Sequence, residues 1–474
     1  MRKFNFKLAG YLFAVSVFFF YSRAVAFDPL TNADWRIKQY RTREVALRLE
    51  DENGSRLKES KVKVKMLNHQ FLFGCNLFRF GDFPTETENQ RYLTLWAGIF
   101  NYATIPFYFK AEKKSEEGEY LRNRETVNWC QDHGVTVKGH PLIWHSPAGN
   151  PKWLTGDVSE VEWAHQERIK RLVSEFSSEI KYWDLLNEPT VAWRYDTPVA
   201  KWENKIGPVK VFQKALKWAK AADRDAFYLV NDFNIDANSN LSSFVGNPER
   251  VIEFSQDPVK HYPVSYKKFV EAVIREGAKP DAVGIQSHMH RGNWPLWELW
   301  QLCDTYAQLR VPVHFTETTI VSGDEKEHIS YSEPKENIPW PTTPGGEQRQ
   351  ADYLAKYYTL LFSHPAVQAI TWWDFSDQGA WLNAPAGLVR KDLSPKPAYD
   401  TLRKLVREKW WTNLENRTDE EGKVRFRGFC GDYQISFADR PETLDFQINC
   451  RKKDGQEIKL RIPLEEKPKK KRRH

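Results

Sequence analysis

The chain has 474 residues, a formal net charge of +7 and 41% hydrophobic residues. This composition excludes a disordered or fibrous protein and allows one large domain with a smaller one beside it. No nucleic-acid-binding fold signature is present, so the positive charge does not point to DNA or RNA as a partner. The 19 tryptophans and 19 tyrosines offer flat faces that stack on sugar rings, although a large core also takes up aromatic side chains.

The first residues predict a secretory signal peptide over residues 1–26. Three basic residues among the first seven precede an apolar run over residues 8–21, and Ala24–Ala26 is a small-x-small cleavage site. The apolar run is short for a membrane-spanning helix, and an uncleaved anchor is the alternative. With cleavage after Ala26, we expect a secreted or periplasmic protein.

The flanking segments, residues 27–70 and 406–465, show the alternation of polar and apolar residues that is typical of β-strands. Glu44–Glu50 and Lys61–Leu67, with a turn at Asp51–Gly54, predict a hairpin. A second set of strands is predicted at 423–429, 433–437, 442–449 and 456–462. Because a lone hairpin is marginally stable in water, we expect both flanks to join in one small β-sandwich.

Between the flanks, over residues 71–405, strand-like apolar runs alternate with amphipathic helical stretches. The predicted strands are 71–77, 101–107, 135–144, 182–188, 227–233, 282–289, 311–317 and 369–375, and the helical stretches include 162–177, 209–222, 265–276, 296–309 and 347–363. Alternation of this kind predicts parallel βαβ units, and eight of them match a closed (β/α)8 TIM barrel. An open doubly wound sheet is the alternative, but no glycine-rich phosphate loop follows the first strand.

Polar and aromatic side chains gather at the ends of these predicted strands, which in a barrel open on one face where active sites are built. They are His140, Trp144, Asn187, Glu188, Asn231, Asp232, Gln286, His288, Glu317, Trp373 and Asp377. Glu188 and Glu317 each end an apolar run, where a carboxylate is costly unless it is solvated, paired or used. Two carboxylates that meet across one cleft are the arrangement that hydrolyses glycosidic bonds.

The remaining features are less specific. A long polar, proline-containing loop over residues 322–346 is interpreted either as a cleft wall or as a mobile insert.

The five cysteines are too sparse for a disulfide framework and lack metal-ligand spacing. Cys430 and Cys450 could pair in an oxidising compartment, whereas Cys75 and Cys130 fit buried thiols. The basic tail, residues 466–474, is either a solvated segment or a contact with an anionic surface.

Six motifs occur in one order along the barrel segment. They are Gly139–His145 (GH-x-L-x-WH), Trp183–Glu188 (WD-x-x-NE), Asn231–Asn234 (NDYN-like), Gly284–His288 (GxQSH), Thr316–Glu317 (TE) and Trp373–Trp381 (WGxxDxxxW-like). Together they resemble glycoside hydrolase family 10, the endo-β-1,4-xylanases, from about Phe71 to about Leu402. The flanks, including Arg427–Tyr433, are similar to those of plant-type and related bacterial members.

The resemblance implies a retaining enzyme that cleaves internal bonds of xylan or decorated xylan, with Glu188 as acid/base and Glu317 as nucleophile. Asn187 would bond the sugar 2-hydroxyl, and Gln286 and His288 would donate to the nucleophile. Substrate binding would fall to Lys110, His140, Trp144, Asn231, Trp373 and Trp381. No metal or cofactor is implied. We expect a monomer with a polysaccharide substrate. The alternatives are the same chemistry on a glucan or plant glycoconjugate, and a carbohydrate-binding protein that has lost catalysis.

Two departures from the family pattern stand out. The second strand of family members ends in a Glu-Asn pair followed by Lys and Trp, which grip the sugar next to the scissile bond, whereas this chain has Pro106 and Phe107, with Lys110 matching the lysine. An unpartnered buried hydroxyl costs about 1–3 kcal/mol.

The family also places Asp two residues after the nucleophile, where this chain has Thr319. Thr319 brings no charge, so we expect a less firmly held His288 imidazolium and activity that falls at a lower pH than in a typical member.

Overall fold

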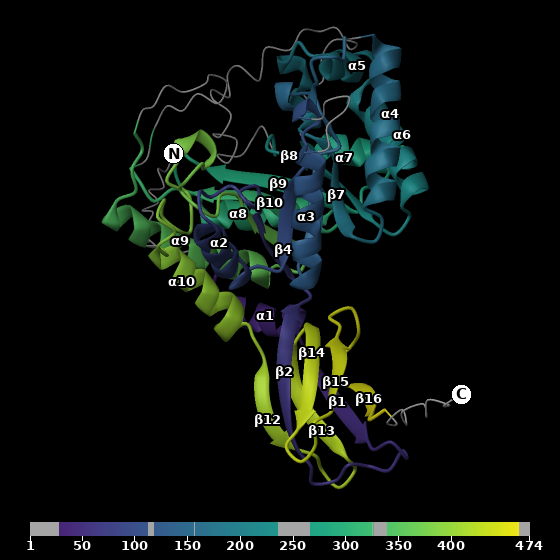
Figure 1. Ribbon diagram of the computed structural model, residues 1–474, viewed down its shortest axis with the longest axis vertical. Coiled ribbons are helices and arrows are strands. Elements are labelled where there is room, and N and C mark those ends of the chain that lie inside the picture. Colours follow the sequence, from purple (N-terminus) through teal and green to yellow (C-terminus); the bar gives the residue numbers. More distant parts are fainter. Residues whose placement is uncertain are drawn as a thin grey trace, which may run out of the picture.

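The computed structural model describes residues 28–111, 118–155, 157–235, 266–324, 326 and 339–463. A helix-wrapped barrel occupies one end of the molecule and a narrow pair of β-sheets the other (Figure 1). The predicted signal peptide, the basic tail and most of the 322–346 loop lie outside the described residues. None of the helices in the described ranges has the length and apolar character needed to cross a membrane.

Eight parallel strands form the barrel. They are β3 (Leu72–Asn76), β4 (Tyr102–Pro106), β5 (Thr136–His140), β7 (Ile180–Asn187), β8 (Phe227–Asp232), β9 (Ala282–Met289), β10 (Val313–Ile320) and β11 (Val367–Trp372). Each pairs with the next, and the β5–β7 and β11–β3 pairings close the ring. The short β6 (Ile143–Trp144) pairs with the end of β7. The predicted (β/α)8 TIM barrel is confirmed.

Helices follow the strands and cover the outside of the barrel. They are α2 (Glu86–Ala97), α3 (Gly118–Asp132), α4 (Val158–Glu175), α5 (Pro198–Ile206), α6 (Pro208–Ala222), α7 (Tyr266–Arg275), α8 (Leu296–Ala307), α9 (Pro344–Ser363) and α10 (Pro397–Lys404), with short helices η1 (Phe109–Ala111), η2 (Pro147–Gly149), η3 (Pro189–Arg194), η6 (Trp381–Asn383) and η7 (Leu405–Lys409). Capping residues in the local sequence determine where several of these helices begin. Thr85 and Glu88 form a capping box on α2, and Asp157 accepts two backbone N–H bonds at the start of α4. These caps fix where the loops of the barrel enter its helices.

Burial on both faces explains why the barrel strands read as continuous apolar runs. All eight residues of β9 and all eight of β10 are buried, as expected for parallel strands covered by helices on one side and by the barrel interior on the other. Polar residues in such strands must find partners inside the protein. Several of those at the ends of β7, β8, β9 and β10 bond one another, among them Asn187, Asn231, Gln286 and Glu317.

The flanks form a β-sandwich beside the barrel. One sheet has the order β13 (Lys423–Phe429), β1 (Thr42–Glu50), β16 (Gln456–Arg461); the other has the order β12 (Asn413–Arg417), β2 (Lys61–His69), β14 (Gly431–Phe437), β15 (Thr443–Ile448). The predicted hairpin of the two N-terminal strands is wrong, because β1 and β2 lie in different sheets. Each has one apolar face, and the two faces share a single core with the C-terminal strands. Because β1 and β2 each pair with C-terminal strands in opposite sheets, their apolar faces are both buried between the two sheets.

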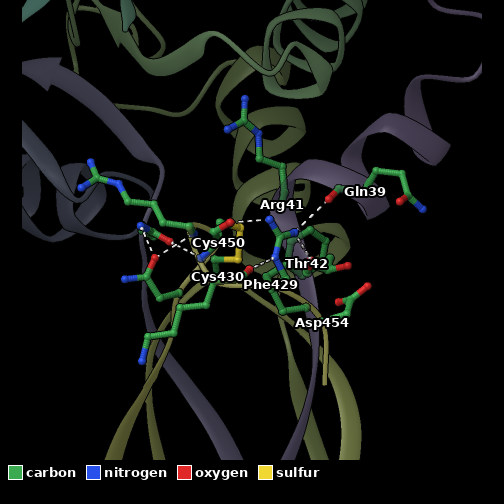
Figure 2. The surroundings of a disulfide bond; sticks show 12 residues. Gln39, Arg41, Thr42, Phe429, Cys430, Cys450 and Asp454 are labelled. Carbon is green, nitrogen blue, oxygen red and sulfur yellow. Dashed lines mark hydrogen bonds between the residues drawn. A yellow bond between two sulfur atoms is a disulfide. The ribbon is translucent and has the colours of Figure 1, made fainter. Parts of the chain in front are cut away.

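Arg41 joins the sandwich to the barrel beside a disulfide that lies within the sandwich. Cys430 and Cys450 are bonded, with their Cα atoms 5.5 Å apart, whereas Cys75, Cys130 and Cys303 are buried free thiols. Figure 2 shows the disulfide beside Arg41, at the end of α1 (Ala33–Arg41). The Arg41 carbonyl accepts a hydrogen bond from the Cys430 N–H, and its guanidinium donates to three backbone carbonyls at and beyond the end of α9.

Candidate active site

Glu188 follows the last residue of β7 in a left-handed backbone conformation, with φ of 58° and ψ of 41°. Such a conformation is uncommon for a residue other than glycine and persists where surrounding contacts hold it. Here the Glu188 N–H donates to the carbonyl of Asn231 at 2.7 Å. The turn ends β7 and starts η3, and it leaves the Glu188 side chain 8% exposed.

Two donors hold the carboxyl group of Glu188. The indole N–H of Trp144 donates to Oε2 at 2.9 Å, and Nε2 of Gln286 donates to Oε1 at 3.2 Å. Burial raises the pKa of Glu188; the charge of His145 lowers it by less, and the charge of Glu317 raises it further. The balance favours a carboxyl that keeps its proton above the ordinary range, as a general acid requires.

Glu317, in β10, has the opposite environment. Asn231 Nδ2 donates to Oε1 at 2.8 Å, and His288 Nε2 lies 2.9 Å from Oε2. Burial by itself would raise the pKa of Glu317, but the hydrogen bond from His288 and the positive charges of His140, His288 and Lys138 outweigh it and lower the pKa. Two buried carboxyls whose pKa values are pushed apart are the pattern of an acid and a nucleophile.

Three side-chain amides connect the two carboxyl groups. Asn187 Oδ1 accepts from Asn231 Nδ2 at 2.9 Å and from Gln286 Nε2 at 3.5 Å, while the same nitrogens serve Glu317 and Glu188. The expected bond from Gln286 to Glu317 is therefore replaced by one to Glu188. Asn231 and His288 already occupy the two oxygens of Glu317, which leaves Gln286 to the other carboxyl.

The predicted site residues divide into a buried floor and partly open walls. Asn231 is fully buried, and its Oδ1 accepts a hydrogen bond from Thr316 Oγ1 at 2.6 Å. This bond orients the Asn231 amide, whose nitrogen donates to Glu317. His140 is 1% exposed, and its Nδ1 lies 2.7 Å from Asp184 Oδ2, which also contacts Lys138 Nζ at 2.6 Å. Both lie in the floor of the site, and their direct contact with substrate stays a prediction.

The walls are aromatic. The ring of Trp373 lies 5.6 Å from that of His140 and 5.8 Å from that of His288. Trp381 is 36% exposed and lies 4.7 Å from the His288 ring. Nδ1 of His288 lies 2.8 Å from Thr319 Oγ1, so Thr319 contacts the imidazole on the side away from Glu317. Lys110 is exposed on η1, beyond β4.

Two residues of the site were missed in the sequence. Tyr108 follows β4, and its ring contacts those of His140 and Trp144. Asp374 follows Trp373 and is 8% exposed; burial raises its pKa to about 7, against a backbone N–H bond from Trp381, and the charges of Asp377 and Glu317 add to the rise. The positions of Tyr108 and Asp374 just beyond strand ends were the available signal in the sequence.

In the described part of the chain, no cluster of three or more His, Cys, Asp or Glu side chains is arranged to hold a metal ion.

A closed (β/α)8 barrel with two differently tuned carboxyls at its strand ends defines a class of enzyme that works by acid/base and nucleophilic chemistry. Residues 85–405, about two thirds of the chain, match the family model of glycosyl hydrolase family 10. The chain belongs to this family.

Several curated proteins are similar to this chain. Endo-1,4-beta-xylanase B of Thermotoga neapolitana is 27% identical over 302 residues, covering 60% of this chain and 73% of that protein. Endo-1,4-beta-xylanase 1 of Arabidopsis thaliana is 22% identical over 83% of this chain and 36% of its own length, and the anti-sigma-I factor RsgI6 of Acetivibrio thermocellus is 23% identical over 86% and 47%. The chain thus spans less than half of the two longer relatives.

Among solved structures, xylanase 10B of Thermotoga maritima has a TM-score of 0.55 and 23% identity, covering 72% of this chain and 96% of that one. The xylanase 10B of Thermotoga petrophila, solved in complex with xylobiose, has the same TM-score, identity and share of this chain. At this level of identity the likeness establishes the barrel fold.

Proposed function

We propose that the protein is an endo-1,4-β-xylanase that hydrolyses xylan or decorated xylan with retention of anomeric configuration. Its family membership and the xylanases among its relatives support this activity. The observation that carries the assignment of roles is the opposite tuning of the two carboxyls, with the pKa of Glu188 raised and that of Glu317 lowered.

The proposed reaction has two displacements. The ionised Glu317 attacks the anomeric carbon and forms a glycosyl ester, while Glu188 gives its proton to the departing sugar oxygen. Glu188, now a carboxylate, takes a proton from a water molecule that attacks the same carbon and releases Glu317. Asn231 and His288 hold Glu317 in place, and the Trp144 and Gln286 donors stabilise Glu188 in the half of the cycle in which it is charged.

The test is product analysis on xylan, arabinoxylan, glucuronoxylan and β-glucan. We expect short xylo-oligosaccharides from the xylans and little release from the glucan. The matched controls are Glu188→Gln and Glu317→Gln, each of which should lose several orders of magnitude in rate. Cleavage of β-glucan but not of xylan would replace xylan as the substrate. Near-normal activity in either variant would remove the assignment of roles.

We also propose that the protein is exported. The predicted signal peptide supports this, and the Cys430–Cys450 disulfide is of the kind that persists in an oxidising compartment. A polymeric substrate too large to enter a cell requires an enzyme outside the cytoplasm. N-terminal sequencing of the protein from a culture medium or periplasmic fraction should begin at Phe27. A cytoplasmic protein with an intact start would contradict export.

The basic tail and the oligomeric state also remain proposals. Residues 466–474 would hold the enzyme against an anionic cell surface or an acidic polysaccharide. Removing them should then abolish salt-sensitive binding to that surface and leave hydrolysis of soluble xylo-oligosaccharides unchanged. We expect a monomer by light scattering.

A further inference from the structure

Pro106 and Phe107, at the end of β4, stand where the family pattern has its Glu-Asn pair. Neither side chain can form a hydrogen bond with a sugar. Pro106 has no N–H, and its carbonyl already accepts from Asn123 Nδ2 at 2.8 Å. Phe107 is 4% exposed, and its ring packs into the core at 5.4 Å from Phe176 and 5.1 Å from Trp183. The polar contacts of that pair must therefore be absent or come from another residue.

Tyr108 is the next residue along the chain, and it lies among the groups of the site. Its ring is 5.8 Å from Trp144, 5.9 Å from His140 and 6.0 Å from Phe78. It is partly exposed, unlike its neighbour Phe107. The chain therefore sends one aromatic side chain into the core and the following one toward the cleft, as expected where a strand ends.

The hydroxyl of Tyr108 lies within electrostatic reach of both carboxyl groups of the site. The pKa of the Tyr108 phenol is raised, first by burial and then by the negative charges of Glu317 and Glu188. A phenol in this position stays protonated at any pH at which the enzyme works, so it can donate a hydrogen bond. The sugar attacked by Glu317 must lie between the two carboxyls, whose charges both act on this phenol.

Tyr108 also belongs to a continuous aromatic arc. From Trp144, which binds Glu188, the arc runs through Tyr108 to Phe78, then to Trp373 at 5.4 Å from Phe78, and on to His288, which binds Glu317. The five rings come from five different strands or the loops beyond them. The arc thus extends from the partner of the acid to the partner of the nucleophile.

We propose that Tyr108 contacts the sugar whose anomeric carbon is attacked, and that with Phe78 it determines which sugar this subsite accepts. The inference rests on the proposed glycoside hydrolysis and specifies its sugar-binding wall. The phenol hydroxyl donates to one sugar hydroxyl, and the rings pack against the apolar face of the sugar. A neutral phenol forms a weaker hydrogen bond with a sugar hydroxyl than a carboxylate does, so this subsite relies more on ring shape than the family pattern would.

The test uses 4-nitrophenyl β-xylobioside, which places both sugars on the side of the attacked carbon and replaces the leaving sugar with an activated phenol. We expect Tyr108→Phe to lower kcat/KM about tenfold and Tyr108→Ala about a hundredfold. Tyr40→Phe and Tyr40→Ala are matched controls, because Tyr40 is exposed on α1; they should match the wild type. Circular dichroism and thermal unfolding establish that each variant is folded.

A panel of monodeoxy 4-nitrophenyl xylobiosides separates contact from structural support. Wild type should lose rate on one member, and Tyr108→Phe should cleave that member as fast as wild type does. A folded Tyr108→Ala within twofold of wild type would overturn the inference, and so would a Tyr108→Phe loss that is equal on every member of the panel. A wild-type protein that hydrolyses no β-xyloside would overturn the proposed function itself, which the first measurement reveals before any variant is made.

Discussion

The amide nitrogen of Asn231 lies 2.8 Å from Oε1 of Glu317, and Asn231 is completely buried. A hydrogen bond to a charged group contributes about 1.5–3 kcal/mol. We therefore predict that Asn231→Ala lowers kcat/KM on xylan by about one to two orders of magnitude, because Glu317 loses both its orientation and part of its stabilisation as a carboxylate.

Asn53→Ala, in an exposed turn of the sandwich, is the matched control and should leave the rate unchanged. The Asn231→Ala profile of kcat/KM against pH should also move its acid limb upward, since Glu317 then holds its proton more tightly. A variant with unchanged rate and unchanged acid limb would remove Asn231 from the positioning of the nucleophile.

Glu188 predicts a dependence on the leaving group. Protonation matters for a poor leaving group such as a sugar and little for a good one such as dinitrophenolate. Glu188→Ala should therefore lose several orders of magnitude on xylan, while the first step on 2,4-dinitrophenyl β-xylobioside, followed as a burst, stays near the wild-type rate. An equal loss of the burst rate on this substrate would contradict the role of Glu188 as the acid.

The pH profile of the wild type follows from the two carboxyls. The pKa of Glu317 is lowered, so activity should fall on the acid side only below the ordinary carboxyl range. The pKa of Glu188 is raised, so activity should fall on the alkaline side as Glu188 loses its proton above that range. Glu188→Gln should lack the alkaline limb in its residual activity on xylan, and a retained limb at the same pH would assign it to another group.

Buried histidines make the fold sensitive to acid. Burial lowers the pKa of His69 to about 3, against 6.5 in the unfolded chain, at the junction of barrel and sandwich. Between pH 6.5 and about pH 3, His69 is protonated in the unfolded chain and neutral in the folded protein. The free energy of unfolding should therefore be fully present above pH 6.5 and fall by up to about 1.4 kcal/mol per pH unit from this residue as the pH drops through that window.

His69→Gln tests this account, because glutamine can keep a donor toward the Val406 carbonyl and does not titrate. Urea unfolding at pH 7.5, 6, 5 and 4 should show a shallower loss of stability with acid in the variant than in the wild type. Parallel curves for the two proteins would show that His69 has the same protonation in the folded and unfolded states.

The disulfide closes a segment of 20 residues between β13 and the end of β15. By the chain-entropy estimate, a loop of this size stabilises the folded state by about 3 kcal/mol. We predict that the Cys430→Ser/Cys450→Ser double variant has a lower unfolding free energy by about that amount, measured by urea titration, with unchanged kcat/KM. A loss of activity in the folded double variant would show that the sandwich affects the active site.

The barrel and the paired carboxyls could be predicted because they leave a periodic signal. Buried parallel strands read as apolar runs, and Glu188 and Glu317 stand out where those runs end. The pairing of β1 with β13 and β16 could not be predicted, since alternation fixes which face of a strand is buried and not which strand lies beside it. A short turn between two alternating segments favoured the wrong partner.

The hydrogen-bond partners within the site were also beyond the sequence. Gln286 and His288 both end β9, but only the packed geometry decides that His288 serves Glu317 and Gln286 serves Glu188. Tyr108 carries no signal of its own in the sequence, because it stands in a run of three aromatic residues, Phe107 to Phe109. Which of two successive aromatics faces the cleft depends on where β4 ends, and strand ends are the least predictable part of a sequence.

In the proposed mechanism, Glu317 forms the covalent bond to the sugar. The most direct test is incubation with 2,4-dinitrophenyl 2-deoxy-2-fluoro-β-xylobioside, which slows release of the intermediate, followed by peptic digestion and mass spectrometry. We expect one equivalent of fluoroxylobiosyl group bound to the peptide that contains Glu317, and no adduct in Glu317→Gln. An active wild-type enzyme that forms no adduct, or an adduct on another carboxyl such as Asp374, would exclude Glu317 as the nucleophile.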